Sequence, residues 1–124
     1  IEDWEAKPSL DKWSRKEILG HLIDSGQNNI RRLIVSQYSQ NERIIYDQNE
    51  WVKYNDYQHV PVDELISLWF LTNKQYNRIS NNIPDESLNL TCNTGKNDIE
   101  LVTLSFFIDD YWGQQQHHLR QIVG

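Results

Sequence analysis

The chain has 124 residues, enough for one modest hydrophobic core, so we expect residues 1–124 to form a single domain. Its formal net charge of −6 argues against a nucleic-acid partner, because such a surface needs clustered lysine and arginine. The one cysteine, Cys92, excludes an intrachain disulfide. No apolar run approaches the roughly 20 residues that span a bilayer. We therefore expect a cytoplasmic protein without a membrane partner.

The first helix is predicted to begin after Ser14. Ser14 and Glu17 have the spacing of a capping box, in which each side chain bonds the backbone N–H of the other residue. Trp13 and Ile18 have the spacing of a hydrophobic staple around the same start. The helix should continue to about residues 36–38. Its apolar side consists of Ile18, Leu19, Leu22, Ile23, Ile30, Leu33 and Ile34.

A long connection follows at 39–60, where helical periodicity is lost and one helical turn is predicted around 49–54. Connections longer than about 12–15 residues are often lids or binding loops. The simpler interpretation, which we favour, is a loop packed over one end of the core. The next helix is predicted to begin at Pro61, since the first turn needs no N–H there, and to end at 81–82 ahead of Pro84.

The segment 88–92 alternates apolar and polar residues, and 93–97 has the composition of a turn. Asp98 is placed to cap a last helix that opens with Ile99 and Leu101 and runs to the chain end. The apolar side of this helix is predicted to be Leu101, Leu104, Ile108, Trp112, Leu119 and Ile122. The fold class is therefore all-α: an up-down bundle of three amphipathic helices, with a long loop between the first two and one small extended excursion.

Two helices carry a row of polar residues along the edge of the apolar side, and we expect these rows to face each other. The row on the first helix is His21, Asp24, Ser25 and Asn28, and that on the last is Asp110, Gln114, His118 and Gln121. Gln114 and His118 are four residues apart and share one side of the helix, which is the geometry by which two helical side chains share a metal. A pair of histidines split between two helices is more often structural or solvated.

Other kinds of site lack their motifs. The sequence contains no glycine-rich phosphate loop, no H-E-x-x-H and no Glu-x-x-His pair of the type that builds di-iron sites. No serine lies in a recognisable nucleophile turn, although the sequence alone leaves a Ser/His/Asp triad open. Cys92 has no identifiable activating neighbour. His117 points to the other side of Gln114 and is interpreted as exposed, and His59 lies in the long connection.

Two stretches resemble the DinB-like superfamily, the damage-inducible-protein-like four-helix bundles. The first is Lys12-Trp13-Ser14-Arg15-Lys16-Glu17-Ile18-Leu19-Gly20-His21-Leu22-Ile23-Asp24-Ser25, and the second runs from Asp110-Tyr111 through His117-His118-Leu119-Arg120-Gln121-Ile122. Asn55-Asp56-Tyr57-Gln58 also resembles members of the superfamily. The resemblance implies one more helix ahead of the first helix predicted here. The absence of methionine agrees with residues missing before Ile1.

The resemblance also implies a divalent metal, often nickel, zinc or iron, held by three histidines. One comes from the first helix recognised here, and two come from the closing motif at a spacing of four. In this sequence the matching positions are His21, Gln114 and His118. Glutamine replaces the middle histidine, and its amide oxygen is a weaker donor for late first-row metals than imidazole. The expected metal site is therefore weakened.

Two classes of function remain open. The first is a metal-dependent enzyme resembling the superfamily's hydrolases or thiol transferases, with His21 and His118 as ligands, Gln114 as a weak ligand and Asp24 as a hydrogen-bond acceptor behind a ligand. The second is a non-catalytic bundle that binds a small molecule or a protein partner. The enzyme is slightly favoured by the resemblance. If the chain associates, a two-fold homodimer is the expected form.

Overall fold

Helix α1, Arg15–Tyr38, is the longest element of the computed structural model, which describes residues 3–124. Its start is the predicted capping box: the Ser14 hydroxyl accepts a hydrogen bond from the Glu17 N–H at 3.2 Å, and Glu17 Oε1 accepts one from the Ser14 N–H at 3.1 Å. Both predicted boundaries of this helix are confirmed. Most of the predicted apolar side is buried, whereas Ile34 is exposed.

The connection after α1 contains more helix than predicted. Helix α2, Gln48–Asn55, is followed by the short 3-10 helix η1, Tyr57–His59. The side chain of Asp47 caps α2 by accepting hydrogen bonds from the N–H groups of Asn49 and Glu50. The helix therefore begins one residue before the predicted 49–54 segment and ends one residue after it. Val52 and Tyr57 are buried, so this part of the connection packs onto the core, as we favoured.

Helix α3, Val62–Asn81, directly follows Pro61, so its predicted bounds are confirmed. A second 3-10 helix, η2, spans Asp85–Ser87 and leads into the predicted extended segment. Strands β1, Thr91–Asn93, and β2, Leu101–Thr103, form an antiparallel pair in which Cys92 lies opposite Val102.

Helix α4, Leu104–Val123, begins later than predicted. Leu101 pairs with Asn93 in the two-stranded sheet, and Ile99 is 77% exposed in the turn that precedes it. The cap is Thr103, whose hydroxyl accepts a hydrogen bond from the Phe106 N–H at 3.2 Å. The prediction that Asp98 caps the last helix is therefore wrong. Residues 101–103 lie outside the helix because they pair with strand β1. Pairing with another strand cannot be recognised from the local sequence.

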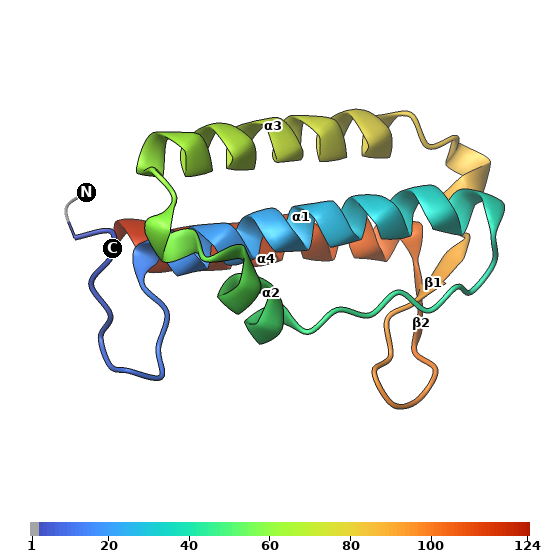
Figure 1. The fold of residues 1–124 in the computed structure, drawn as a ribbon. Coiled ribbons are helices and arrows are strands. Elements are labelled where there is room, and N and C mark those ends of the chain that lie inside the picture. Colours follow the sequence, from blue (N-terminus) through green and yellow to red (C-terminus); the bar gives the residue numbers. More distant parts are fainter. Residues whose placement is uncertain (1–2) are drawn as a thin grey trace.

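The three long helices form the bundle, with α1 in contact with both α3 and α4 (Figure 1). The start of α1 lies beside the end of α4, where the Arg15 side chain donates to the Ile122 carbonyl at 3.0 Å, so these helices are antiparallel. The predicted all-α bundle is confirmed. No helix in the described part of the chain is long and apolar enough to cross a membrane.

The core consists of two apolar clusters separated by a layer of buried polar side chains. Within this layer the Tyr111 hydroxyl donates to Asn73 Oδ1 at 2.7 Å, and the Asn28 amide donates to the Asp24 carbonyl at 2.9 Å. Thr72 and Gln115 belong to the same layer. One cluster contains Leu19, Leu22, Ile23, Val52, Tyr57, Leu65 and Ile122. The other contains Ile30, Leu33, Tyr76, Ile83, Cys92, Leu104, Phe107 and Tyr111.

Candidate metal site and adjoining groove

The imidazoles of His21 and His118 meet between α1 and α4. Their ring centroids lie 5.0 Å apart with an interplanar angle of 84°. The indole of Trp13 lies on His21 as well, with centroids 4.9 Å apart. His21 is 7% exposed, and its Nδ1 is buried without a hydrogen-bond partner in the described residues. The two predicted polar rows therefore face each other at this point.

His21 is held in its neutral form. Burial, and then the neighbouring imidazole of His118, lower the pKa of His21 to about 4 from its ordinary 6.5. A neutral imidazole keeps the lone pair with which histidine coordinates metals. Proton competition at this donor is therefore weak at neutral pH.

His118 is half-buried and is oriented from within its own helix. Its Nδ1 lies 3.0 Å from Oε1 of Gln121. With this amide orientation Nδ1 carries the proton, and Nε2 carries the lone pair. A hydrogen bond to the far ring nitrogen is a common way to fix the orientation of a metal-binding histidine.

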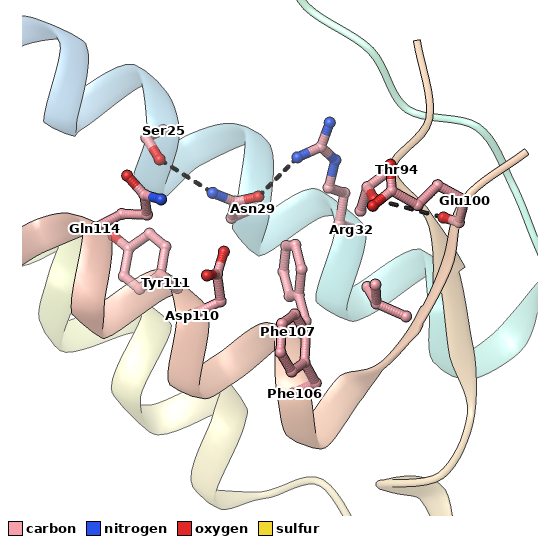
Figure 2. A pocket seen from close by; sticks show the side chains of 11 residues that line it. Ser25, Asn29, Arg32, Thr94, Glu100, Phe106, Phe107, Asp110, Tyr111 and Gln114 are labelled. Carbon is pink, nitrogen blue, oxygen red and sulfur yellow. Dashed lines mark hydrogen bonds between the residues drawn. The ribbon is translucent and has the colours of Figure 1, made fainter. Parts of the chain in front are cut away.

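Gln114 lies one turn before His118 and is exposed. Figure 2 shows its amide beside Ser25 of α1, at one end of a groove. Among residues 3–124, no group of three or more His, Cys, Asp or Glu side chains is placed to hold a metal ion. The donor set that the structure offers at the predicted position is therefore two imidazoles from two helices, whereas the Gln114 amide lies beside Ser25, one turn after His21 on α1. This donor set fits a divalent ion held weakly, with water completing the coordination.

Asp24, one turn after His21, is fully buried. Burial raises the pKa of Asp24 to about 6, and the hydrogen bond from Tyr57 opposes this shift. Its Oδ1 accepts from the Tyr57 hydroxyl at 2.5 Å and from the Asn55 amide at 3.2 Å, whereas Oδ2 has no partner in the described residues. These bonds attach the α2–η1 segment to α1. The predicted role of Asp24 behind a metal-bound histidine stays a prediction.

The groove between α1, α4 and the strand hairpin has a volume of about 360 Å³. One wall is a chain of hydrogen bonds along α1: Asn29 donates to the Ser25 hydroxyl at 3.0 Å, and Arg32 donates to Oδ1 of Asn29 at 3.0 Å (Figure 2). The other wall is α4, from which Asp110 and Gln114 extend. The remaining lining residues are Thr94, Glu100, Val102, Phe106, Phe107 and Tyr111.

Gln115 is a buried polar residue whose position the sequence analysis missed. It is 3% exposed, and its Oε1 accepts a hydrogen bond from the Trp69 indole N–H at 3.0 Å. Its amide nitrogen lies 3.5 Å from the carbonyl of Leu22. The available signal was its spacing of four from Tyr111, which is buried on the same side of α4.

The two remaining histidines are both exposed. His117 is exposed as interpreted from the sequence, and its ring lies beside that of His118 with centroids 5.2 Å apart. His59 is also exposed, and its Nδ1 lies 2.8 Å from Oδ1 of Asp56, within the same connection.

Three long helices with facing polar rows form a helical bundle, which is the fold that the sequence resemblance implied. The chain has the fold of YfiT from Bacillus subtilis, with a TM-score of 0.86 over 97% of this chain and 69% of that one, at 18% sequence identity. YfiT is described as a probable metal-dependent hydrolase with an unusual four-helix bundle topology. No protein-family model and no curated protein matches the sequence. The cytoplasmic location and the homodimer stay predictions.

Proposed function

We propose that the protein is a metal-dependent enzyme of the hydrolase or thiol-transferase class whose metal site is weakened. In this proposal His21 and His118 hold a nickel, zinc or iron ion, and Gln114 contributes a weak amide oxygen. The observation that carries it is the approach of two imidazoles from different helices, with ring centroids 5.0 Å apart. The likeness of the fold to a probable metal-dependent hydrolase agrees with this assignment.

The residues around the histidines support the same proposal. His21 is neutral, and its buried Nδ1 has no partner among residues 3–124, so a metal-bound state satisfies an otherwise unpaired atom or reorients the ring. Gln121 fixes the ring of His118 from the side opposite its free nitrogen. Trp13 covers His21 and limits access of water to it.

A divalent ion at such a position lowers the pKa of a bound water or thiol and so supplies a nucleophile near neutral pH. The chain's own contribution is to orient the ligands and to position the substrate. Asp24 lies one turn from His21 and keeps one carboxylate oxygen without a partner in the described residues, so it can accept a hydrogen bond from a ligand imidazole. Ser25 and Gln114 are placed to orient a substrate where the groove begins.

Metal content tests the proposal directly. Purified protein is stripped with a chelator, dialysed against nickel, zinc or iron salts, and analysed by plasma mass spectrometry. We expect metal bound by the wild-type chain, lost in His118→Ala and retained in His59→Ala, an exposed histidine of η1 that serves as control. Absence of metal from the wild-type chain, or equal metal in both variants, would contradict the proposal.

A second candidate is a non-catalytic bundle that binds a small molecule in the groove. It is favoured by the exposed glutamine at position 114, which stands where the resemblance implies a histidine. Metal-loaded protein should distinguish the two candidates. Turnover of ester, amide or thiol-reactive substrates that disappears in His118→Ala supports the enzyme. Ligand binding that needs neither the metal nor His118 supports the non-catalytic bundle.

A further inference from the structure

Arg32 is a half-buried cation without an anionic partner. The ion pairs recorded in the described part of the chain involve Lys7, Lys16 and His59, and none involves Arg32. Burial lowers the pKa of Arg32, and the nearby Tyr46 phenol and Cys92 thiol oppose this shift. This partly desolvated guanidinium lacks the electrostatic stabilisation of a paired carboxylate. A bound anion can supply that stabilisation.

Part of this guanidinium has a structural role. Its Nε and Nη2 both donate to the Ile44 carbonyl, at 3.0 and 2.6 Å, which holds the connection after α1 against the helix. Nη1 donates to Oδ1 of Asn29 at 3.0 Å. Nη1 and Nη2 each carry a second N–H, for which no acceptor is recorded within residues 3–124. Because Arg32 lines the groove, these groups are available to a ligand there.

The rest of the groove limits what such a ligand can be. Phe106 is 58% exposed, and with Phe107 and Val102 it gives the groove an apolar side. Asp110 extends from α4 between Arg32 and Gln114 in Figure 2, and Glu100 is a second carboxylate in the lining, so the groove repels a second anion and favours an N–H donor. A volume of about 360 Å³ suits a small molecule.

We propose that the groove binds small carboxylate-terminated molecules of the N-acyl amino acid or short-peptide class. The carboxylate pairs with the free N–H groups of Arg32, an amide N–H faces Asp110, and an apolar side chain packs on Phe106. On α1, Ser25 and Arg32 are seven residues apart, which is about 10 Å along the helix and matches a molecule of this size. A bidentate pairing of guanidinium and carboxylate gives both affinity and orientation.

This inference deepens the proposed function by naming a substrate class, and it rests on that function only for the reaction. The far end of the groove, at Gln114 and Ser25, lies one helical turn from His118 on α4 and from His21 on α1, so a molecule anchored at Arg32 extends its acyl or amide group in their direction. Binding at Arg32 itself requires no metal. The two proposals can therefore fail separately.

The test is calorimetric titration of metal-free protein, kept in chelator, with N-acetylphenylalanine and with its uncharged amide. We expect saturable binding of the carboxylate at least about tenfold tighter than that of the amide, since hydrogen bonds to charged groups contribute more than neutral ones. Equal affinities, or no binding of either probe, would overturn the inference. This comparison uses only the wild-type chain, so it is independent of how any variant folds.

Two matched pairs of variants locate the binding. Arg32→Gln should weaken the carboxylate about tenfold or more, whereas Arg31→Gln, at the exposed neighbouring position, should leave it unchanged. Phe106→Ala should weaken it a few-fold, whereas Phe70→Ala, at an exposed phenylalanine of α3 outside the groove, should have no effect. A folded Arg32→Gln variant with wild-type affinity would also overturn the inference. Probe binding without metal binding would instead count against the proposed function alone.

Discussion

The ring of Tyr57 lies directly on the backbone of α1 at Gly20. A Cβ atom added to Gly20 would lie 2.0 Å from Cδ2 of Tyr57, far inside van der Waals contact. Tyr57 is also the residue whose hydroxyl bonds Asp24. The close approach at Gly20 therefore allows η1 to reach the buried carboxylate.

We expect Gly20→Ala to destabilise the protein by about 1–3 kcal/mol, because the buried Tyr57 ring has to move to accept the methyl group. Gly113→Ala is the matched control, since a Cβ there meets nothing within 4 Å. It should stabilise α4 by about 0.5–1 kcal/mol through helix propensity. Urea unfolding followed by circular dichroism measures both changes. Stabilisation by both substitutions would show that Tyr57 does not rest on Gly20 in solution.

Restoring an imidazole to the closing motif should strengthen the metal site. We expect Gln114→His to raise the affinity for zinc or nickel about tenfold or more, because imidazole is a better donor than an amide oxygen for these ions. Gln116→His, at an exposed position on another side of α4, is the matched control. Affinity is measured by competition with a chromophoric chelator. Equal gains in both variants would indicate adventitious binding at the surface.

The raised pKa of Asp24 predicts the direction in which the stability of the protein changes with pH. Because the pKa is raised from 3.8 to about 6, the folded chain holds this proton more tightly than the unfolded chain. The resulting stabilisation is complete below about pH 4 and is lost as the pH rises through 6. Asp24→Asn removes this dependence, and its side-chain oxygen can still accept the Tyr57 hydrogen bond.

We therefore expect Asp24→Asn to be more stable than the wild type by about 1–3 kcal/mol at pH 8, with the difference shrinking toward pH 4. Denaturant unfolding across this pH range measures it, and contributions from other groups cancel in the difference. Asp110→Asn, an exposed carboxylate of α4, provides the control profile. A constant difference between Asp24→Asn and the wild type would contradict the raised pKa.

Gln115 should matter for stability more than its polar character suggests. Gln115→Leu removes the acceptor of the Trp69 indole N–H, and we expect a loss of about 1–3 kcal/mol. Gln116→Leu replaces the exposed neighbour and should change stability by less than about 0.5 kcal/mol. The near-ultraviolet circular dichroism of the tryptophans should also change in Gln115→Leu. Equal stability of the two variants would mean that the indole finds another acceptor.

The features predicted correctly from the sequence are those with a local cause. The Ser14–Glu17 capping box spans four residues, and it set the start of α1. The start of α4 was missed because Leu101 is held by Asn93 on another strand. Nothing in the local pattern of apolar residues distinguishes that strand from a first helical turn.

The buried side of α4 was predicted only in part. Leu104 and Ile122 are buried, as predicted, whereas Tyr111 and Gln115 are buried in place of the half-buried Trp112. Tyr111 stacks on Tyr76 with ring centroids 3.8 Å apart, and Gln115 is paired with Trp69. Both partners come from α3, so periodicity within α4 alone favoured the more hydrophobic side.

In the candidate site, too, the features with a local cause were predicted and those that depend on long-range contacts were not. The polar rows predicted that His21 faces α4, because helical spacing fixes which residues share a side. The attachment of Asp24 to Tyr57, which lies 33 residues further along the chain, had no sequence signal. Long-range contacts of this kind depend on how the connection folds back, which spacing does not encode.

The polar layer between the two apolar clusters has a consequence for the axial alignment of the helices. A shift of α3 or α4 by one turn, about 5.4 Å, would move Asn73 or Gln115 against apolar side chains and leave Tyr111 and Trp69 without their hydrogen-bond partners. Each unpaired group would cost about 1–3 kcal/mol, whereas a uniformly apolar interface would tolerate sliding. Gln115 also lies 3.5 Å from the Leu22 carbonyl of α1 through its amide nitrogen, so this layer helps to align α4 with α1 as well. Substitutions at Gln115 can therefore misalign His21 and His118 while both candidate ligands are still present.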